Sequence, residues 1–137
     1  MTGLHILLDT HIALWAITNS TKLPDTAREI LLSYDNEIYF SIASVWELSI
    51  KHSNHPEHMT FTGREFSDYC KGAGYIPLPI RENHVFALET LKRPEDAPRH
   101  KDPFDRLLIA QAKAEGLLLL THDSLIPFYN ESFIIKV

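Results

Sequence analysis

The chain has 137 residues, of which 45% are hydrophobic and 23% charged, and its formal net charge is -5 at pH 7. This length suits one domain over residues 1–137, which would bury roughly 68% of the surface of the unfolded chain. The single cysteine, Cys70, excludes an internal disulfide. No apolar run is long enough to cross a bilayer, and no basic segment precedes the apolar amino end, so we expect a cytoplasmic protein without a signal peptide.

The first third of the sequence alternates between strand and helix patterns. The apolar run over residues 4–8 ends at Asp9, and apolar residues then recur at helical spacing over residues 12–17. Pro24 opens a second helix, and residues 37–40 form the next short strand. The order is therefore strand, helix, helix, strand.

Ser41 is a good N-cap for a third helix. We expect this helix to turn four apolar side chains inward, namely Ile42, Val45, Trp46 and Ile50. A neighbouring face carries three polar side chains in register, namely Ser44, Glu47 and Lys51.

The second half of the chain continues the alternation. The expected segments are a helix over 61–70, an edge strand over 75–80, a helix over 81–91, a charged loop over 93–101, a helix over 102–115, and strands over 117–121 and 133–137. Strands separated by helices predict a parallel sheet covered by helices on both faces, an α/β fold. Such sheets bind ligands at the carboxyl ends of their strands, where Asp9 and Asp123 fall.

Acidic residues recur at the strand-to-helix junctions. Asp9 follows the first strand, Asp102 and Asp105 begin a helix, and Asp123 follows the strand over 117–121. Glu47 lies on the third helix. Because carboxylates are the ligands that Mg²⁺ and Mn²⁺ prefer, the pattern predicts an exposed, carboxylate-walled metal site and phosphoester chemistry.

Each acid also has a purely structural interpretation. Asp9, Asp102 and Asp123 can be helix caps, and Asp105 can interact with the helix dipole. Glu47 can pair with Lys51 across one helical turn. Capping explains the acids one at a time, but it does not explain why separate junctions present acids toward one edge of the sheet.

The same segments resemble the four motifs of the PIN-domain nucleases. Leu7 to His11 (Leu-Leu-Asp-Thr-His) is similar to the first motif, and residues 41–51, with Glu47 at the acidic position, are similar to the second. Residues 100–112 resemble the third motif and residues 120–123 the fourth. The resemblance is greatest to VapC-type toxins of bacterial toxin-antitoxin pairs.

This resemblance implies a PIN-like three-layer α/β/α fold and a Mg²⁺- or Mn²⁺-dependent endoribonuclease. It also implies a homodimer and a small antitoxin whose tail blocks the active site. The residues expected to bind the metal and support catalysis are Asp9, Glu47, Asp105 and Asp123. Four other residues are expected either to orient the metal ligands or to have a role that is left open, namely Thr10, Ser44, Thr121 and Asp102. A metal-activated water would hydrolyse the RNA phosphodiester bond without a covalent enzyme intermediate.

Several other interpretations remain open. The chain can be a catalytically weak PIN-fold module that binds RNA or protein, or a phosphatase or receiver-type domain that forms an aspartyl phosphate. The second would need an acidic pair after the first strand, which has only Asp9. Histidines beside the motifs can assist proton transfer, namely His5, His11, His100 and His122. Zinc binding is suggested by the spacing of His52, His55 and His58, but Pro56 breaks their helical face. Basic residues that can line the rim of the site are Lys51, Arg64, Arg93, Arg99, Lys101 and Arg106.

Overall fold

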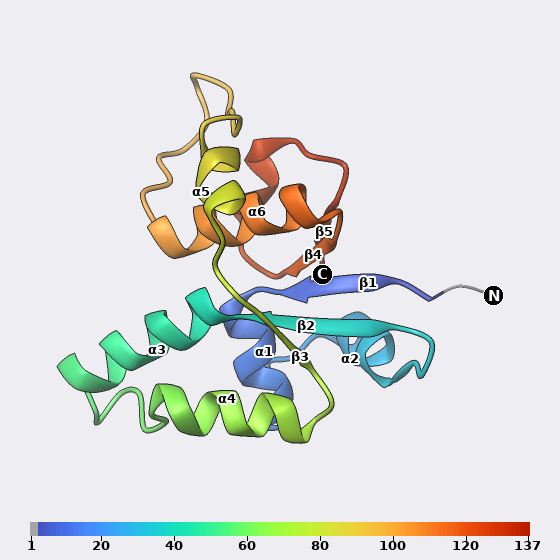
Figure 1. Ribbon diagram of the computed structural model, residues 1–137, viewed down its shortest axis with the longest axis vertical. Helices are drawn as coiled ribbons and strands as arrows, with labels where there is room; N and C mark the ends of the chain where they lie inside the picture. The colour runs from blue at the N-terminus through green and yellow to red at the C-terminus, as the bar shows by residue number, and fades with distance from the viewer. Residues whose placement is uncertain (1–2) are drawn as a thin grey trace.

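The computed structural model describes residues 3–137 and shows one parallel sheet between two layers of helices (Figure 1). The strands are β1 (His5–Leu8), β2 (Glu37–Ser41), β3 (Ile76–Leu78), β4 (Leu118–Thr121) and β5 (Ile134–Lys136). The helices are α1 (Thr10–Ile17), α2 (Asp25–Leu32), α3 (Ile42–Asn54), α4 (Gly63–Gly72), α5 (Glu82–Leu88) and α6 (Pro103–Glu115), with a short 3-10 helix η1 (Ile126–Tyr129). The expected domain boundary at residue 1 lies outside the described residues. Over the described range, no helix is both long and apolar enough to cross a membrane.

The strand order is β3-β2-β1-β4-β5, and all neighbouring strands are parallel. The chain runs outward from β1 through β2 to β3 and then crosses to the other side of β1 for β4 and β5. The strand order therefore reverses between β1 and β4, where Leu8 pairs with Leu120 and the Asp9 amide donates to the Leu120 carbonyl at 3.0 Å. In open parallel sheets, the crevice at this point is the usual ligand site.

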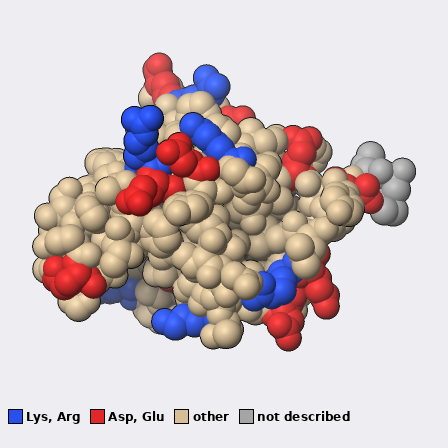
Figure 2. All heavy atoms as spheres, turned by 90° about the horizontal axis from the view of Figure 1, so that it is seen from below, with Lys and Arg blue, Asp and Glu red and all other residues tan. Residues whose placement is uncertain are grey.

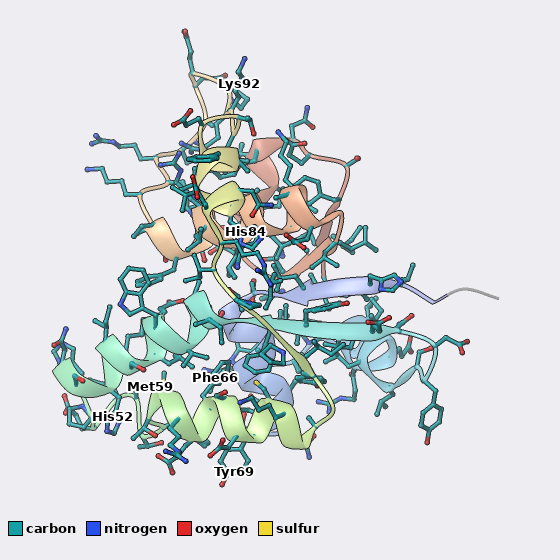
Figure 3. The ribbon with its side chains drawn as sticks, in the orientation of Figure 1. His52, Met59, Phe66, Tyr69, His84 and Lys92 are labelled. Carbon is teal, nitrogen blue, oxygen red and sulfur yellow. The ribbon has the colours of Figure 1, made fainter. Side chains whose placement is uncertain are left out.

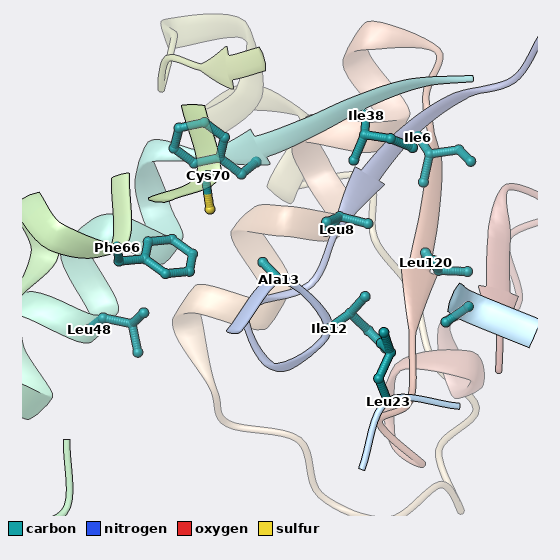
Figure 4. Close-up of a cluster of buried hydrophobic side chains, with 12 residues drawn as sticks. Ile6, Leu8, Ile12, Ala13, Leu23, Ile38, Leu48, Phe66, Cys70 and Leu120 are labelled. Carbon is teal, nitrogen blue, oxygen red and sulfur yellow. The ribbon is translucent and has the colours of Figure 1, made fainter. Parts of the chain in front are cut away.

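Helices cover both faces of the sheet, which confirms the expected three-layer α/β/α fold. In Figure 1, α5 and α6 lie on one side of the strands, and α1, α2 and α4 lie on the other. Side chains alternate along β1, so Ile6 and Leu8 join the core cluster under α1 and α4 (Figure 4), while Leu7 joins the cluster under α6. Because both faces are covered, all three side chains are buried.

Polar caps fix the starts of the helices that follow the strands. The Ser41 side chain accepts from the Ala43 amide at 2.9 Å and begins α3, as expected. Asp102 caps α6, whose first residue is Pro103, and Gly116 ends this helix in the left-handed region at φ 68°. These caps fix where α3 and α6 begin and therefore where their acidic residues, Glu47 and Asp105, lie.

The prediction of which face of α3 is buried was wrong. Trp46 is 54% exposed and Ile50 is 38% exposed. The helix instead buries Ala43, Ser44, Glu47 and Leu48. Because α3 has apolar residues on more than one side, its periodicity does not predict which face is buried. Contacts with α4 and α6 determine the buried face instead.

Two helices also have other bounds than the sequence pattern indicated. The expected helix over 61–70 begins at Gly63, because Thr62 forms a capping box with Glu65, and it continues to Gly72. The expected helix over 81–91 covers only Glu82–Leu88.

Candidate functional site

Asp9 lies at the point where the strand order reverses, between β1 and α1. Its Oδ1 accepts from the Ile12 amide at 2.8 Å and caps α1, while its Oδ2 accepts from the Thr121 hydroxyl at the end of β4. Only 3% of Asp9 is exposed, so this part of the site is more buried than the exposed cluster we expected. Burial raises the pKa of Asp9, and the hydrogen bonds from Thr121 and Ile12 oppose that rise.

Glu47 reaches the same edge from α3, and its carboxylate accepts a hydrogen bond from a hydroxyl of α1. Its Oε1 accepts from the Thr10 hydroxyl at 2.8 Å, and the Thr10 and Ser44 hydroxyl oxygens lie 2.8 Å apart. Its Oε2 accepts from Lys51 Nζ at 2.7 Å. The expected pair with Lys51 is therefore present, but the Glu47 side chain is only 5% exposed rather than on an exposed helix face.

Asp105 stands in the first turn of α6 and contacts a buried histidine. His100 Nε2 lies 3.1 Å from Asp105 Oδ2, and His100 Nδ1 lies 2.8 Å from the Tyr129 hydroxyl. Burial lowers the pKa of His100 and so favours the neutral ring. A neutral ring that donates from Nε2 to Asp105 and accepts at Nδ1 from Tyr129 satisfies both contacts.

The charge around Asp105 is unusually concentrated. Burial, followed by the negative charges of neighbouring acids, raises the pKa of Asp105 to about 8. In decreasing order of effect, the neighbouring acids are Asp102, Asp123, Asp9 and Glu47. The fold has therefore brought all the acidic residues singled out from the sequence into one electrostatic neighbourhood.

Asp102 caps α6 within this neighbourhood, and Asp123 accepts backbone amides in the turn before η1. Asp102 Oδ1 accepts from the amides of Phe104 at 2.9 Å and Asp105 at 3.2 Å. Asp123 Oδ1 accepts from the Leu125 amide at 2.7 Å and from the Ile126 amide at 3.2 Å. The capping interpretation thus holds for Asp102, whereas the N-cap of η1 is Leu125 and Asp123 forms the turn before it. Neither contact removes these acids from the acidic crevice.

The donor atoms at this edge suit a hard divalent cation, because carboxylate and hydroxyl oxygens predominate. Over residues 3–137, no three His, Cys, Asp or Glu side chains are yet arranged so that they could hold one ion. Each carboxylate is turned toward its own hydrogen-bond donors, which is favourable for like charges in a shared crevice. The residues fit a cation by their chemistry and proximity, and rotation of carboxylate side chains would be needed to bind it.

The other candidate residues are divided between the site and distant surfaces. His11 and His122 flank Trp15 beside Asp9 and Asp123, whereas His5 lies at the opposite end of β1 and contacts Glu37 at 3.4 Å. Arg64 pairs with Asp68 on α4, away from the acids. His52 contacts the Met59 carbonyl at 2.8 Å, and His55 and His58 both lie near Glu57.

The remaining basic candidates lie on the loop that leads into α6 and on α6 itself. The Arg93 guanidinium lies 5.5 Å from the centre of the Tyr129 ring, and the positive charge of Arg106 opposes the rise in the pKa of Tyr129 that burial causes. Arg99 and Lys101 lie on either side of His100 in the chain.

Two supporting residues were missed in the sequence. Tyr129 reaches His100 from η1, and no motif signals this contact between residues far apart in the chain. His84, labelled in Figure 3, is fully buried on α5, contacts Glu115 of α6 at 2.8 Å and accepts from the Arg81 amide at 3.0 Å. For His84, the only signal in the sequence was its position three residues after the predicted start of a helix, where a side chain can accept from the backbone amide of the capping residue.

Comparisons with known proteins agree with the fold. Residues 6–129 match the family model described as PIN domain. The fold is similar to a chain of VapBC2 from Rickettsia felis bound to a promoter DNA fragment, at 22% identity over 98% of each chain and a TM-score of 0.68. It is also similar to chains of FitAcB from Neisseria gonorrhoeae (19% identity, 96% of each chain, TM-score 0.62) and of a toxin-antitoxin complex from Klebsiella pneumoniae (13% identity, 96% of each chain, TM-score 0.62). At such identities the likeness shows the fold alone, and no curated protein matches the sequence.

Proposed function

Because the chain belongs to the PIN domain family, whose members are generally nucleases that use divalent metal ions, we propose that it is a Mg²⁺- or Mn²⁺-dependent endoribonuclease. The observation that carries this proposal is the position of Asp105. The negative charges of four other acids raise the pKa of its carboxyl group. One of these acids lies at the start of the same helix, and the other three come from three separate segments of the chain. All of them gather at the carboxyl edge of one parallel sheet.

Asp9, Glu47, Asp105 and Asp123 would hold the cation, directly or through water. The cation would supply Lewis-acid activation of water and neutralise charge on the phosphodiester. The protein positions these carboxylates with hydrogen bonds. Thr121 donates to Asp9, His100 contacts Asp105, and Thr10, which is itself in contact with Ser44, donates to Glu47. Such supporting hydrogen bonds orient ligands and set their basicity.

The wider biological assignment follows the same family. The solved structures that resemble this chain include toxin-antitoxin complexes, which supports a role as the toxin of a bacterial pair with a small antitoxin, in the cytoplasm. Trp46 and Ile50 are exposed on α3, and Val85 and Phe86 on α5, and these apolar side chains support a homodimer. We propose that residues 1–137 act as a single PIN-like domain in this assembly.

Asp9→Asn tests the cation site most directly. The amide keeps the side-chain shape and caps α1 about as well, but it loses the anionic oxygen. We expect RNA cleavage in Mn²⁺ or Mg²⁺ to fall below detection, measured by mapping new ends in total RNA. We also expect the metal-free melting temperature to be unchanged and the rise in melting temperature on adding Mn²⁺ to be lost.

Asp68→Asn is the matched control, because it makes the same charge change at a side chain that is 67% exposed on α4. It should keep both cleavage and stabilisation by Mn²⁺, and preparing both variants identically excludes a contaminating ribonuclease. Full cleavage by Asp9→Asn would disprove the cation mechanism. RNA binding without cleavage in the wild type would favour the noncatalytic binding module.

A further inference from the structure

A cavity of about 200 Å³ opens beside the acidic residues of the site, and five residues line it. Two are Asp9 and Asp123, which we have proposed to hold the cation. The other three carry rings, namely His11, Trp15 and His122. A ligand in this cavity would therefore contact aromatic rings close to the acids that we propose to hold the cation.

The three rings are arranged around Trp15. The centroid of the His11 ring lies 5.8 Å from that of Trp15 with 45° between the planes, and the His122 centroid lies 5.7 Å from it with 65° between the planes. Rings that are tilted at these distances do not form a flat stack, and all three residues line the cavity, where a ligand can contact them. His11 and His122 are exposed, whereas Trp15 is half-buried and also packs against the core under α1.

Both sides of the cavity are fixed by the elements that form the crevice. His11 and Trp15 are four residues apart on α1, so they share a face of the helix that Asp9 caps. The His122 amide contacts Asp9 Oδ2 at 3.4 Å, and its ring Nδ1 contacts the Val137 oxygen. The rings therefore keep a set position relative to the proposed cation site.

We propose that this cavity binds an unpaired nucleobase of the RNA, on the nucleotide next to the phosphate that is cleaved. This proposal rests on the proposed ribonuclease function and adds a place where the substrate is recognised. Bases in single-stranded RNA expose faces that stack on Trp and His, whereas bases in a duplex are already stacked and paired. The enzyme should accordingly cut single-stranded regions and prefer certain bases beside the cut.

The two tryptophans of the chain allow a direct binding test. Trp46→Phe leaves Trp15 as the only indole fluorophore, and adding Asp105→Asn prevents cleavage during the titration. The probe is a short single-stranded RNA of mixed sequence, compared with an RNA of the same length in which every base is replaced by an abasic site. We expect the first RNA to quench Trp15 fluorescence and the abasic RNA to bind much more weakly.

Substitutions at Trp15 separate stacking from packing. Trp15→Leu keeps an apolar side chain against the core but removes the ring, so RNA affinity should fall about 5- to 150-fold, the loss that corresponds to one base stacked on an aromatic side chain. Trp15→Phe should restore most of the affinity. In an otherwise wild-type chain, Trp15→Leu should still cleave in Mn²⁺ but with a changed base preference at the new ends.

The possible failures are distinguishable. Equal binding of both RNAs, or an unchanged affinity and cleavage pattern in Trp15→Leu, would overturn the nucleobase site while leaving the nuclease function intact. Trp15→Leu that lost binding of a partner protein but kept RNA affinity would also overturn it and assign the cavity to that partner. Absence of both RNA binding and cleavage in the wild-type chain would reject the proposed function together with the cavity.

Discussion

At the scale of single residues, the acids that cap helices are also the acids that create the charged crevice. Asp9 and Asp102 cap helices, and Asp123 accepts the Leu125 amide in the turn before η1. All three acids raise the pKa of Asp105. A cap and a ligand can be the same residue, because a carboxylate at a helix start can also lie near the carboxyl edge of the sheet. An acidic residue that caps a helix can therefore still belong to the site.

Asp102 and Asp105 can be separated by substitution. Asp105→Asn should abolish RNA cleavage without lowering stability, because Asp105 is the N3 residue of α6 and does not cap it. Asp102→Asn should keep most activity, since Asn caps about as well as Asp, while Asp102→Ala should cost about 1 kcal/mol of stability. Cleavage rates and melting temperatures of the three variants decide the matter, and an inactive Asp102→Asn beside an active Asp105→Asn would reverse the assignment.

The raised pKa of Asp105 predicts a pH dependence of stability in the metal-free protein. Its pKa is about 8 in the folded protein and 3.8 in the unfolded chain, so the folded state holds a proton that the unfolded state releases between these values. This contribution to stability is complete below about pH 4 and is lost as the pH rises through about 8. Asp105→Asn removes it.

The measurement is the difference in metal-free melting temperature between Asp105→Asn and the wild type, taken from about pH 5 to about pH 9. We expect the variant to gain stability relative to the wild type over this range. A difference that does not depend on pH would show that Asp105 titrates normally. Asp68→Asn, on the exposed face of α4, provides the control for a simple change in net charge.

At the scale of helices and strands, the sequence predicted the order of elements well but not how they pack. Periodicity and caps located α3 and α6 because Ser41, Asp102 and Pro103 act locally. The prediction of the buried face of α3 was wrong, because contacts with α4 and α6 determine which of its apolar faces is buried. In the site, the motifs identified the acids, whereas the contact between Tyr129 and His100 could not be predicted because it joins residues 29 positions apart.

The packing of α4 against α3 depends on the absence of a side chain at Gly63. A Cβ at this position would meet Ser49 Oγ at 1.9 Å and the Val45 carbonyl oxygen at 3.0 Å. Gly63→Ala should therefore cost about 1–3 kcal/mol of stability, the usual effect of overpacking, as measured by urea unfolding.

Two further variants test the cause of that loss. Adding Ser49→Ala to Gly63→Ala removes the nearest atom and should recover part of the stability. Gly72→Ala, at the other end of α4, has open space around the new Cβ and should be neutral or slightly stabilising. If Gly63→Ala were as stable as Gly72→Ala, close helix contact would not be the reason for glycine at position 63.

At the scale of the whole molecule, charge is distributed in a way that suits a cation better than bare RNA. The formal net charge is -5, and the face in Figure 2 shows small groups of acidic and basic side chains separated by uncharged surface. RNA phosphates would be repelled by the acidic crevice until its charge is neutralised. The rim residues Arg93 and Arg106, near Tyr129, then provide basic groups beside the site.

The same charge distribution predicts how a protein partner would inhibit the enzyme. A crevice with several carboxylates and few basic groups is a receptor for an Arg or Lys side chain, so a small antitoxin should place one there. We expect the chain to copurify as a dimer with the small protein encoded beside its gene, and the partner to block RNA cleavage. Replacing the partner's basic residue by Ala should release the cleavage activity, and Asp9→Asn should weaken the complex, as light scattering and titration calorimetry would show. A neighbouring gene that encodes no small protein, together with harmless expression of the chain with its acids intact, would reject the toxin assignment, and RNA cleavage by the purified protein would then have to be explained by another role.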